Sequence, residues 1–123
     1  MRRPAETGWQ ERLPAVDLDE GYSGKILLVS ITCGRETVTV LRSGGRWHRE
    51  ILRNCEEEVL ALGLLQARVV PEGGAHLRFA PDGSLHLWGR SEQFGTCNYD
   101  KAAAILASRW PGRRVAHPWG ERA

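Results

Sequence analysis

The stretch KILLVSIT, residues 25–32, is an almost unbroken run of apolar and β-branched side chains. Such a run is typical of a strand covered on both faces, so it predicts a central strand of a sheet. The next segment, ETVTVLRS at 36–43, alternates, with Val38 and Val40 on one face of the pleat and Leu41 on the other. The turn residues CGRE between the two runs favour a hairpin.

A long amphipathic segment follows this hairpin. From His48 to Leu62 the apolar residues recur at intervals of one, three and four positions, whereas Arg49, Arg53 and most glutamates fall elsewhere. This spacing predicts a helix with one buried stripe, which ends at Gly63. The stripe comprises Ile51, Leu52, Cys55, Val59 and Leu62.

Short alternating runs occupy the middle of the chain. The turn stretches PEGG and PDG separate them and predict three individual strands. In the last strand, the alternation puts Leu85 and Leu87 on one face and His86 and Trp88 on the other. The three strands are expected at 64–70, 75–80 and 84–89.

The last third of the chain predicts a second helix and a final strand. Asn98 is a suitable N-cap, and apolar residues repeat at helical spacing up to Trp110, ahead of Pro111. RRVAHP, residues 113–118, is expected to form a short strand. The order β-β-α-β-β-β-α-β indicates an α+β fold, with a single mixed sheet of about six strands and two main helices packed on it.

Length and composition indicate one domain. A chain of 123 residues, 41% of them hydrophobic, buries one core and is too short for two domains. We expect a single domain over residues 1–123, with its core at roughly 13–116. The polar segment up to about Asp19 and the tail from His117 are expected to be loose or laid across the surface.

Charge and cysteine content exclude several classes of protein. Seventeen basic against fifteen acidic residues give a formal charge of +2, which argues against nucleic-acid or membrane partners. The three cysteines are far apart and never spaced as CxxC, so neither a disulfide framework nor a zinc site is indicated, and a cytoplasmic location fits best. No run approaches the roughly 20 apolar residues of a membrane span.

His48 stands at the start of the first predicted helix, where backbone N–H groups lack intrahelical partners and the helix dipole favours anions. Gly44 to Trp47 include no Ser, Thr, Asp or Asn to cap those groups, so they are open to a ligand such as phosphate. The dipole also disfavours imidazolium, and a neutral imidazole acts as a base or a nucleophile. The alternative is a histidine that only packs against or caps the helix.

The loop GRSEQFG, residues 89–95, joins a predicted strand to the second predicted helix and has a glycine at each end. Such a loop turns successive N–H groups inward and forms an anion-binding nest, to which the Ser91 hydroxyl adds a donor. Taken alone, an ordinary connecting loop is the simpler interpretation.

Three ordered segments carry a family resemblance: LPAVDLDEGYSGK at 13–25, WHREILRNCEEEVLALG at 47–63 and LHLWGRSEQFG at 85–95. The third is similar to an apolar-His-apolar-aromatic-Gly-x-Ser-x-x-aromatic-Gly pattern. Together they resemble the phosphohistidine phosphatase family, also called Janus/ocnus, over roughly residues 13–116. The resemblance implies the fold expected above.

The same resemblance implies a metal-independent protein phosphatase, without a cofactor, that releases inorganic phosphate from phosphohistidine in a protein or peptide. His48 matches the family's catalytic histidine, as general base or nucleophile, and Lys25 matches a lysine near the phosphate. No nucleic acid or membrane partner is implied.

The remaining site residues also follow from the resemblance. The loop residues match a family loop that holds phosphate largely through backbone amides, and the residues on either side of His48 are assigned to the same site. Two arginines are further candidates for phosphate contacts. The loop residues are Ser91, Glu92 and Gln93. The neighbours of His48 are Trp47 and Arg49, and the two arginines are Arg42 and Arg78.

Two positions depart from the family pattern. Where the family has an arginine after a glycine turn, this chain has Ala75, and Glu92 adds a negative side chain to a loop that binds an anion. The alternative function is therefore a non-catalytic module that binds phosphate or a phosphorylated partner through the same pocket.

Overall fold

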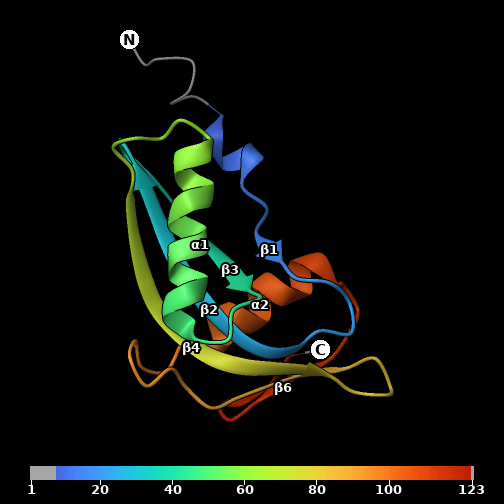
Figure 1. Ribbon diagram of the computed structural model, residues 1–123. Coiled ribbons are helices and arrows are strands. Elements are labelled where there is room, and N and C mark those ends of the chain that lie inside the picture. The colour runs from blue at the N-terminus through green and yellow to red at the C-terminus, as the bar shows by residue number, and fades with distance from the viewer. Residues whose placement is uncertain (1–7, 123) are drawn as a thin grey trace.

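The computed structural model describes residues 8–122 (Figure 1). Within them, one mixed sheet of seven strands has the order β1-β3-β2-β4-β5-β6-β7. This confirms the α+β fold with a single sheet and two main helices. The elements are a 3-10 helix at Trp9–Arg12, β1 Val16–Asp17, β2 Ser23–Cys33, β3 Glu36–Ser43, α1 His48–Ala61, β4 Arg68–Phe79, β5 Leu85–Trp88, α2 Tyr99–Arg109, β6 Val115–His117 and β7 Gly120–Arg122.

The predicted hairpin β2–β3 forms, and β2 lies inside the sheet, because it pairs antiparallel with β3 along one edge and with β4 along the other. Side chains alternate along β2, so this strand supplies two cores. Ile26 and Leu28 point to one face of the sheet, and Leu27 and Val29 point to the other. Burial on both faces explains the unbroken apolar run in the sequence.

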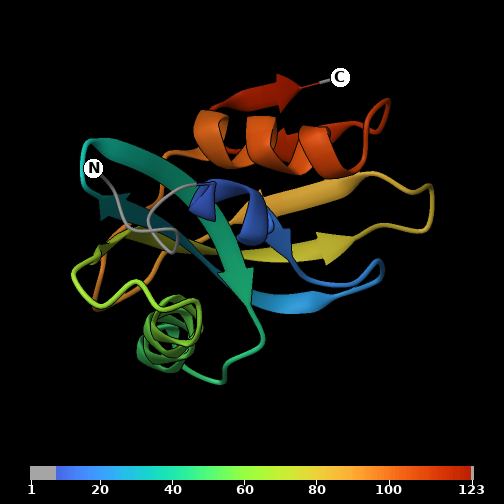
Figure 2. The same cartoon turned by 90° about the horizontal axis from the view of Figure 1, so that it is seen from above.

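The two helices cover opposite faces of the sheet (Figure 2). The stripe predicted for α1 is confirmed in outline, since Ile51, Cys55 and Val59 are buried against β2 and β3; we call this cluster the α1-side core. On the other face, Ala103 and Leu106 of α2 are buried against strands β2 to β6; we call this cluster the α2-side core. Each helix is thus held mainly by apolar contact with the sheet.

The C-terminal elements follow the sequence prediction closely. Leu85 and Leu87 of β5 are buried in the α2-side core, whereas Trp88 lies on the other face and is 43% exposed. The Asn98 side chain caps α2 by accepting a hydrogen bond of 3.0 Å from the Lys101 N–H. The predicted last strand is β6, which pairs parallel with β5.

The PEGG stretch is not a turn, which corrects the prediction of separate strands at 64–70 and 75–80. Both belong to β4, which starts only at Arg68 and runs on through a bulge: Leu27 of β2 faces Gly74, but Val29 already faces Pro71. A bulge uses the same glycines as a turn, so local composition does not separate the two. Pro71 is tolerated because this half of β4 pairs with β2 alone.

At the bulge, β4 also forms hydrogen bonds with the segment that follows β5. The Gly74 N–H donates to the Gly95 carbonyl at 2.9 Å, and the Cys97 N–H donates to the Gly74 carbonyl at 3.1 Å. The segment that follows β5 is therefore fastened to the middle of β4. Gly73 has a φ of +104°, and a Cβ there would lie 2.6 Å from the Thr96 carbonyl oxygen. Only glycine permits this approach.

The chain ends are more ordered than predicted within the described residues, while residues 1–7 and 123 lie outside them. Trp9 is completely buried and packs with Leu13 into the α1-side core. Strand β1 pairs parallel with β3, and β7 pairs antiparallel with β6. Two buried apolar residues and one short strand anchor a segment whose composition is polar overall.

The three cysteines are free and buried. Cys55 belongs to the α1-side core as predicted, and Cys97 belongs to the α2-side core. Burial raises the pKa of both thiols to about 11. Over residues 8–122, no helix is long and apolar enough to cross a membrane.

Replacing Gly73 tests the bulge. We expect Gly73→Ala to lower the free energy of unfolding by about 2–4 kcal/mol, because it combines backbone strain at positive φ with a clash against the Thr96 carbonyl. Gly83→Ala is the matched control, since Gly83 has a φ of +88° but no atom within 4 Å of the added Cβ. It should cost only about 1–2 kcal/mol. Equal losses in urea denaturation would contradict the role assigned to the bulge.

Candidate functional site

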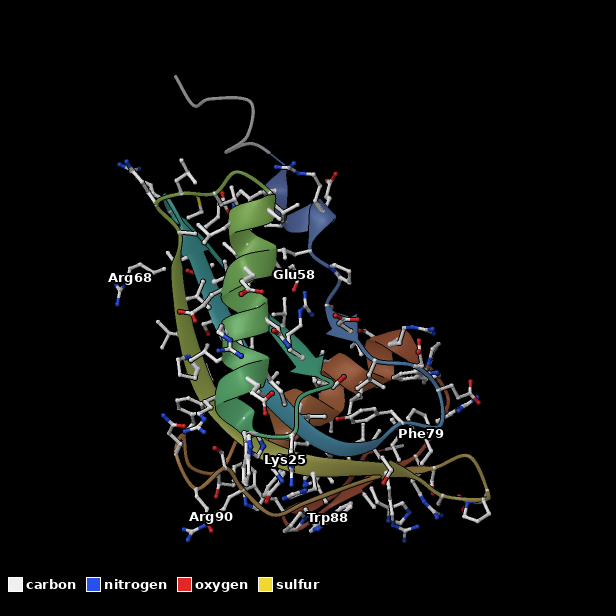
Figure 3. All side chains as sticks on the ribbon, in the orientation of Figure 1. Lys25, Glu58, Arg68, Phe79, Trp88 and Arg90 are labelled. Atoms are coloured by element: carbon white, nitrogen blue, oxygen red, sulfur yellow. The ribbon has the colours of Figure 1, made fainter. Side chains whose placement is uncertain are left out.

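A pocket of about 470 Å³ opens at the N-terminal end of α1. Figure 3 shows Lys25 and Arg90 at this end of the molecule, although they come from distant parts of the chain. Seven of the nine lining residues were candidates from the sequence, and two, His76 and Arg90, were not. The lining residues are Lys25, Trp47, His48, Arg49, His76, Arg90, Ser91, Glu92 and Gln93.

The sheet places one cation and one imidazole in a row across neighbouring strands. Lys25 of β2 pairs with His76 of β4, which in turn pairs with Trp88 of β5. Because Lys25 and Leu27 are two residues apart, Lys25 points to the same face of the sheet as the α1-side core. The row therefore continues that face beyond the start of α1 and forms one wall of the pocket.

His48 is 6% exposed, and its environment defines its tautomer. The Nε2 atom lies 3.2 Å from the Ala75 carbonyl oxygen, which can only accept, so Nε2 carries the proton in the neutral ring. Nδ1 then holds the lone pair and has no hydrogen-bond partner in the described chain. It is also not enclosed, since the Trp9 Nε1 is the one buried side-chain nitrogen or oxygen without a partner in residues 8–122.

The pKa of His48 is lowered from its ordinary value of 6.5, mainly by burial and also by the Lys25 charge. The hydrogen bond to the Ala75 carbonyl and the nearby Ile26 backbone oppose this effect. The direction agrees with the sequence prediction, but the helix dipole invoked there is not the main cause. The result is a ring that is neutral at pH 7 and offers Nδ1 as a base or a nucleophile.

Residues whose backbone N–H groups have no partner in residues 8–122 line the pocket from two segments. The N-cap of α1 is Trp47, whose indole has no acceptor, so the first N–H groups of the helix, at His48 and Arg49, have no partner in the described chain. The N–H groups of Glu92 and Gln93 likewise have none within residues 8–122. Free donors at a helix N-terminus and in a tight loop favour an anion.

The 89–95 loop is held in a defined shape. Ser91 and Gly95 exchange two backbone hydrogen bonds of 3.0 and 2.9 Å, and the Ser91 hydroxyl accepts from the Phe94 N–H at 3.0 Å. The Tyr99 hydroxyl donates to the Gly89 carbonyl and so ties the start of the loop to α2. The loop is therefore organised before any ligand binds. Glu92 is exposed at its tip.

His76 is a pocket residue that the sequence argument did not assign to the site. Its ring stacks on Trp88, with centroids 5.6 Å apart, and meets the His48 ring edge-on at 6.1 Å. Burial, Lys25 and His48 lower its pKa. Because Ala75 points into the α2-side core, its neighbour His76 points to the opposite face of the sheet, toward the pocket. This alternation is the signal in the sequence that could have identified His76.

Two sequence candidates do not line this pocket. Arg42 is buried beside α1, where its Nε and Nη2 donate to the two carboxylate oxygens of Glu58 at 2.8 and 3.1 Å. A buried guanidinium with a bidentate partner holds α1 on β3 instead of contacting a ligand. Arg78 lies further along β4, opposite Ser23 of β2.

The pocket combines anion-binding donors with a neutral imidazole. Its lining residues include three cationic ones, Lys25, Arg49 and Arg90, and one acidic one, Glu92. Over residues 8–122, no group of three or more His, Cys, Asp or Glu side chains has the arrangement of a metal site. What the arrangement can do chemically is bind a tetrahedral oxyanion and present an unprotonated ring nitrogen to it.

The family comparison covers the fold and this pocket together. The sequence model of the Janus/Ocnus family matches residues 10–114. The chain belongs to the Janus/Ocnus family. Every residue that lines the pocket falls within the Janus/Ocnus match. A comparison with curated proteins gives no match.

Inorganic phosphate tests the pocket directly. We expect phosphate titrated into the labelled protein to shift the amide NMR signals of residues 47–49 and 91–94 most, together with the His48 and His76 ring signals. The free N–H groups and the cations place the anion there. Amides of the β2–β3 turn, at Gly34 and Arg35, serve as the internal control. Shifts spread evenly over the surface would show that the pocket has no preference for an anion.

Proposed function

We propose that this protein is a phosphohistidine phosphatase, which hydrolyses the phosphoramidate bond of phosphohistidine in a protein or peptide. One observation supports the proposal above the others: the unprotonated Nδ1 of a buried histidine shares a pocket with two separate sets of unpartnered backbone N–H groups. A pocket that only held an anion would not need a fixed tautomer beside it. The family resemblance in the sequence points the same way.

The proposed reaction uses few groups, because the phosphorus–nitrogen bond is intrinsically labile. Water attacks phosphorus while His48 Nδ1 takes up its proton, or Nδ1 attacks phosphorus itself and water later cleaves the phosphorylated ring. In either route the electron pair of the broken bond leaves with the substrate imidazole, which takes a proton. Inorganic phosphate is the product, and no metal or cofactor is part of the proposal.

Charge neutralisation is assigned to the remaining pocket residues. Lys25, Arg49 and Arg90 balance the charge on the phosphoryl oxygens as it shifts in the transition state. His76 stands opposite His48 and can donate a hydrogen bond to an oxygen of the same group. It is the pocket residue that compensates for the absence of an arginine at Ala75.

A non-catalytic phosphate-binding module is the second candidate function. The observations that favour it are the absent arginine and the carboxylate of Glu92 among the lining residues. The side chain of Glu92 is exposed, so the charge is largely screened by solvent. We therefore rank catalysis above binding alone.

Substitution of His48 separates the two functions. With a phosphohistidine peptide as substrate, we expect His48→Ala to lower kcat by about 10²–10⁴-fold, because it removes the one group that moves a proton or attacks phosphorus. His86→Ala is the matched control, since His86 bonds to the Ser84 hydroxyl at 3.1 Å and does not line the pocket. It should retain wild-type kcat. Peptide binding without turnover by the wild-type protein would establish the binding module instead.

The pH dependence follows from the lowered pKa of His48. The neutral ring is the active form, so kcat/KM should stay level through pH 7–8 and fall as the pH drops, with a midpoint below the ordinary 6.5. The uncatalysed loss of phosphate from the acid-labile substrate is subtracted at each pH. His76→Asn should keep this acid limb, because His76 is not the proposed base. A midpoint above 6.5 in the wild-type protein would contradict the assignment.

A further inference from the structure

A second hollow opens beside the phosphate pocket, on the outer side of the first turns of α1. It shares Trp47 and Arg49 with the pocket, so the two depressions adjoin at these side chains. A ligand that fills the pocket can therefore extend directly into the hollow. The hollow is lined by Arg46, Trp47, Arg49, Glu50 and Arg53.

The charge of this hollow is one-sided. Arg46, Arg49 and Arg53 are exposed, and within the described chain none has a carboxylate at ion-pair distance. The single acidic residue, Glu50, is engaged, because its Oε1 accepts from the Trp47 N–H at 3.1 Å. Arginines at positions 49 and 53 are one helical turn apart and repel each other. An anionic partner would relieve this repulsion, which no contact inside the chain does.

The aromatic residue of the hollow is also available for contact. Trp47 is 51% exposed, and the Arg46 guanidinium lies over its ring, 5.8 Å from the centroid. Exposed Trp and Arg side chains gathered at one place are the composition of an interface hot spot. A tryptophan kept half-exposed between two hollows contributes nothing to either core.

We propose that this hollow binds acidic side chains next to the phosphohistidine in the substrate polypeptide, an inference that rests on the proposed function. The phosphoryl group occupies the pocket, and neighbouring Asp or Glu residues reach the arginines across Trp47. The surface then selects substrates by the charge around their histidine and speeds their encounter. A nucleic acid fits the formal charge of +2 less well, since such partners usually call for a larger positive excess.

Two peptides test this selection. Both carry phosphohistidine, one flanked by glutamates and the other by glutamines of the same shape. We expect the wild-type protein to prefer the glutamate peptide by about fivefold to tenfold in kcat/KM, through KM and less at high salt. The double variant Arg46→Gln, Arg53→Gln should lose the preference but keep wild-type turnover of the glutamine peptide, because neither residue lines the phosphate pocket.

Arg68→Gln is the matched control, since Arg68 is exposed and Figure 3 shows it away from the N-terminal end of α1. It should keep the full preference. Equal kcat/KM for the two peptides in the wild-type protein, or a preference that survives in the double variant, overturns the inference.

Failure of the proposed function would be distinguishable from failure of this inference. If neither peptide were hydrolysed, the phosphatase proposal would fall, and fluorescence anisotropy of both peptides would then decide about the hollow. Tighter binding of the glutamate peptide, lost in the double variant, supports an acidic ligand. Tighter binding of a single-stranded oligonucleotide than of either peptide, lost in the same variant, overturns it in favour of nucleic acid.

Discussion

Gly73 and Gly74 have no side chains, so strand β4, helix α1 and the segment after β5 can meet there. The β4 bulge passes close to the Thr96 backbone, Gly74 exchanges hydrogen bonds with the segment after β5, and the His48 ring rests on Gly74, where a Cβ would lie 2.6 Å from its Nε2. A methyl group at Gly73 would collide with the Thr96 backbone, and one at Gly74 would collide with the His48 ring. The two glycines therefore hold the loop and the imidazole of α1 close to β4.

Apolar packing and polar chemistry are divided along the face of the sheet that carries α1. Where α1 covers β2 and β3, the strand residues that point to it are buried and, apart from Arg42, mainly apolar. Beyond its first turn, the same face continues with Lys25, His76 and Trp88. The helix thus performs two tasks: its stripe closes a core, and its N-terminus places His48 at the boundary between that core and solvent. The bidentate contact between Arg42 and Glu58 supports this placement.

The sequence predicted what depends on local periodicity and short-range chemistry. The hairpin, both helices and the Asn98 cap follow from spacing and side-chain type. His48 became a candidate because the helix start lacked a capping residue and because the family resemblance matched it. What it could not predict depends on pairing between distant strands. The PEGG stretch has the composition of a turn but belongs to a strand with a bulge. Arg42 has a side chain suited to binding phosphate, but it forms an ion pair with Glu58 instead. His76 reaches the pocket only through its register with Lys25.

The buried thiols have a consequence for the chemistry of the pocket. None of the three cysteines lines it, and the pKa values of Cys55 and Cys97 are raised to about 11, so these two sulfurs stay protonated and inert. Phosphatases that attack with a thiolate stop working when peroxide converts that sulfur to sulfenic acid. In the reaction proposed for this pocket the reacting atom is an imidazole nitrogen, which has no sulfur to oxidise. Under oxidative stress, the proposed hydrolysis would continue while thiol-dependent hydrolases were silenced.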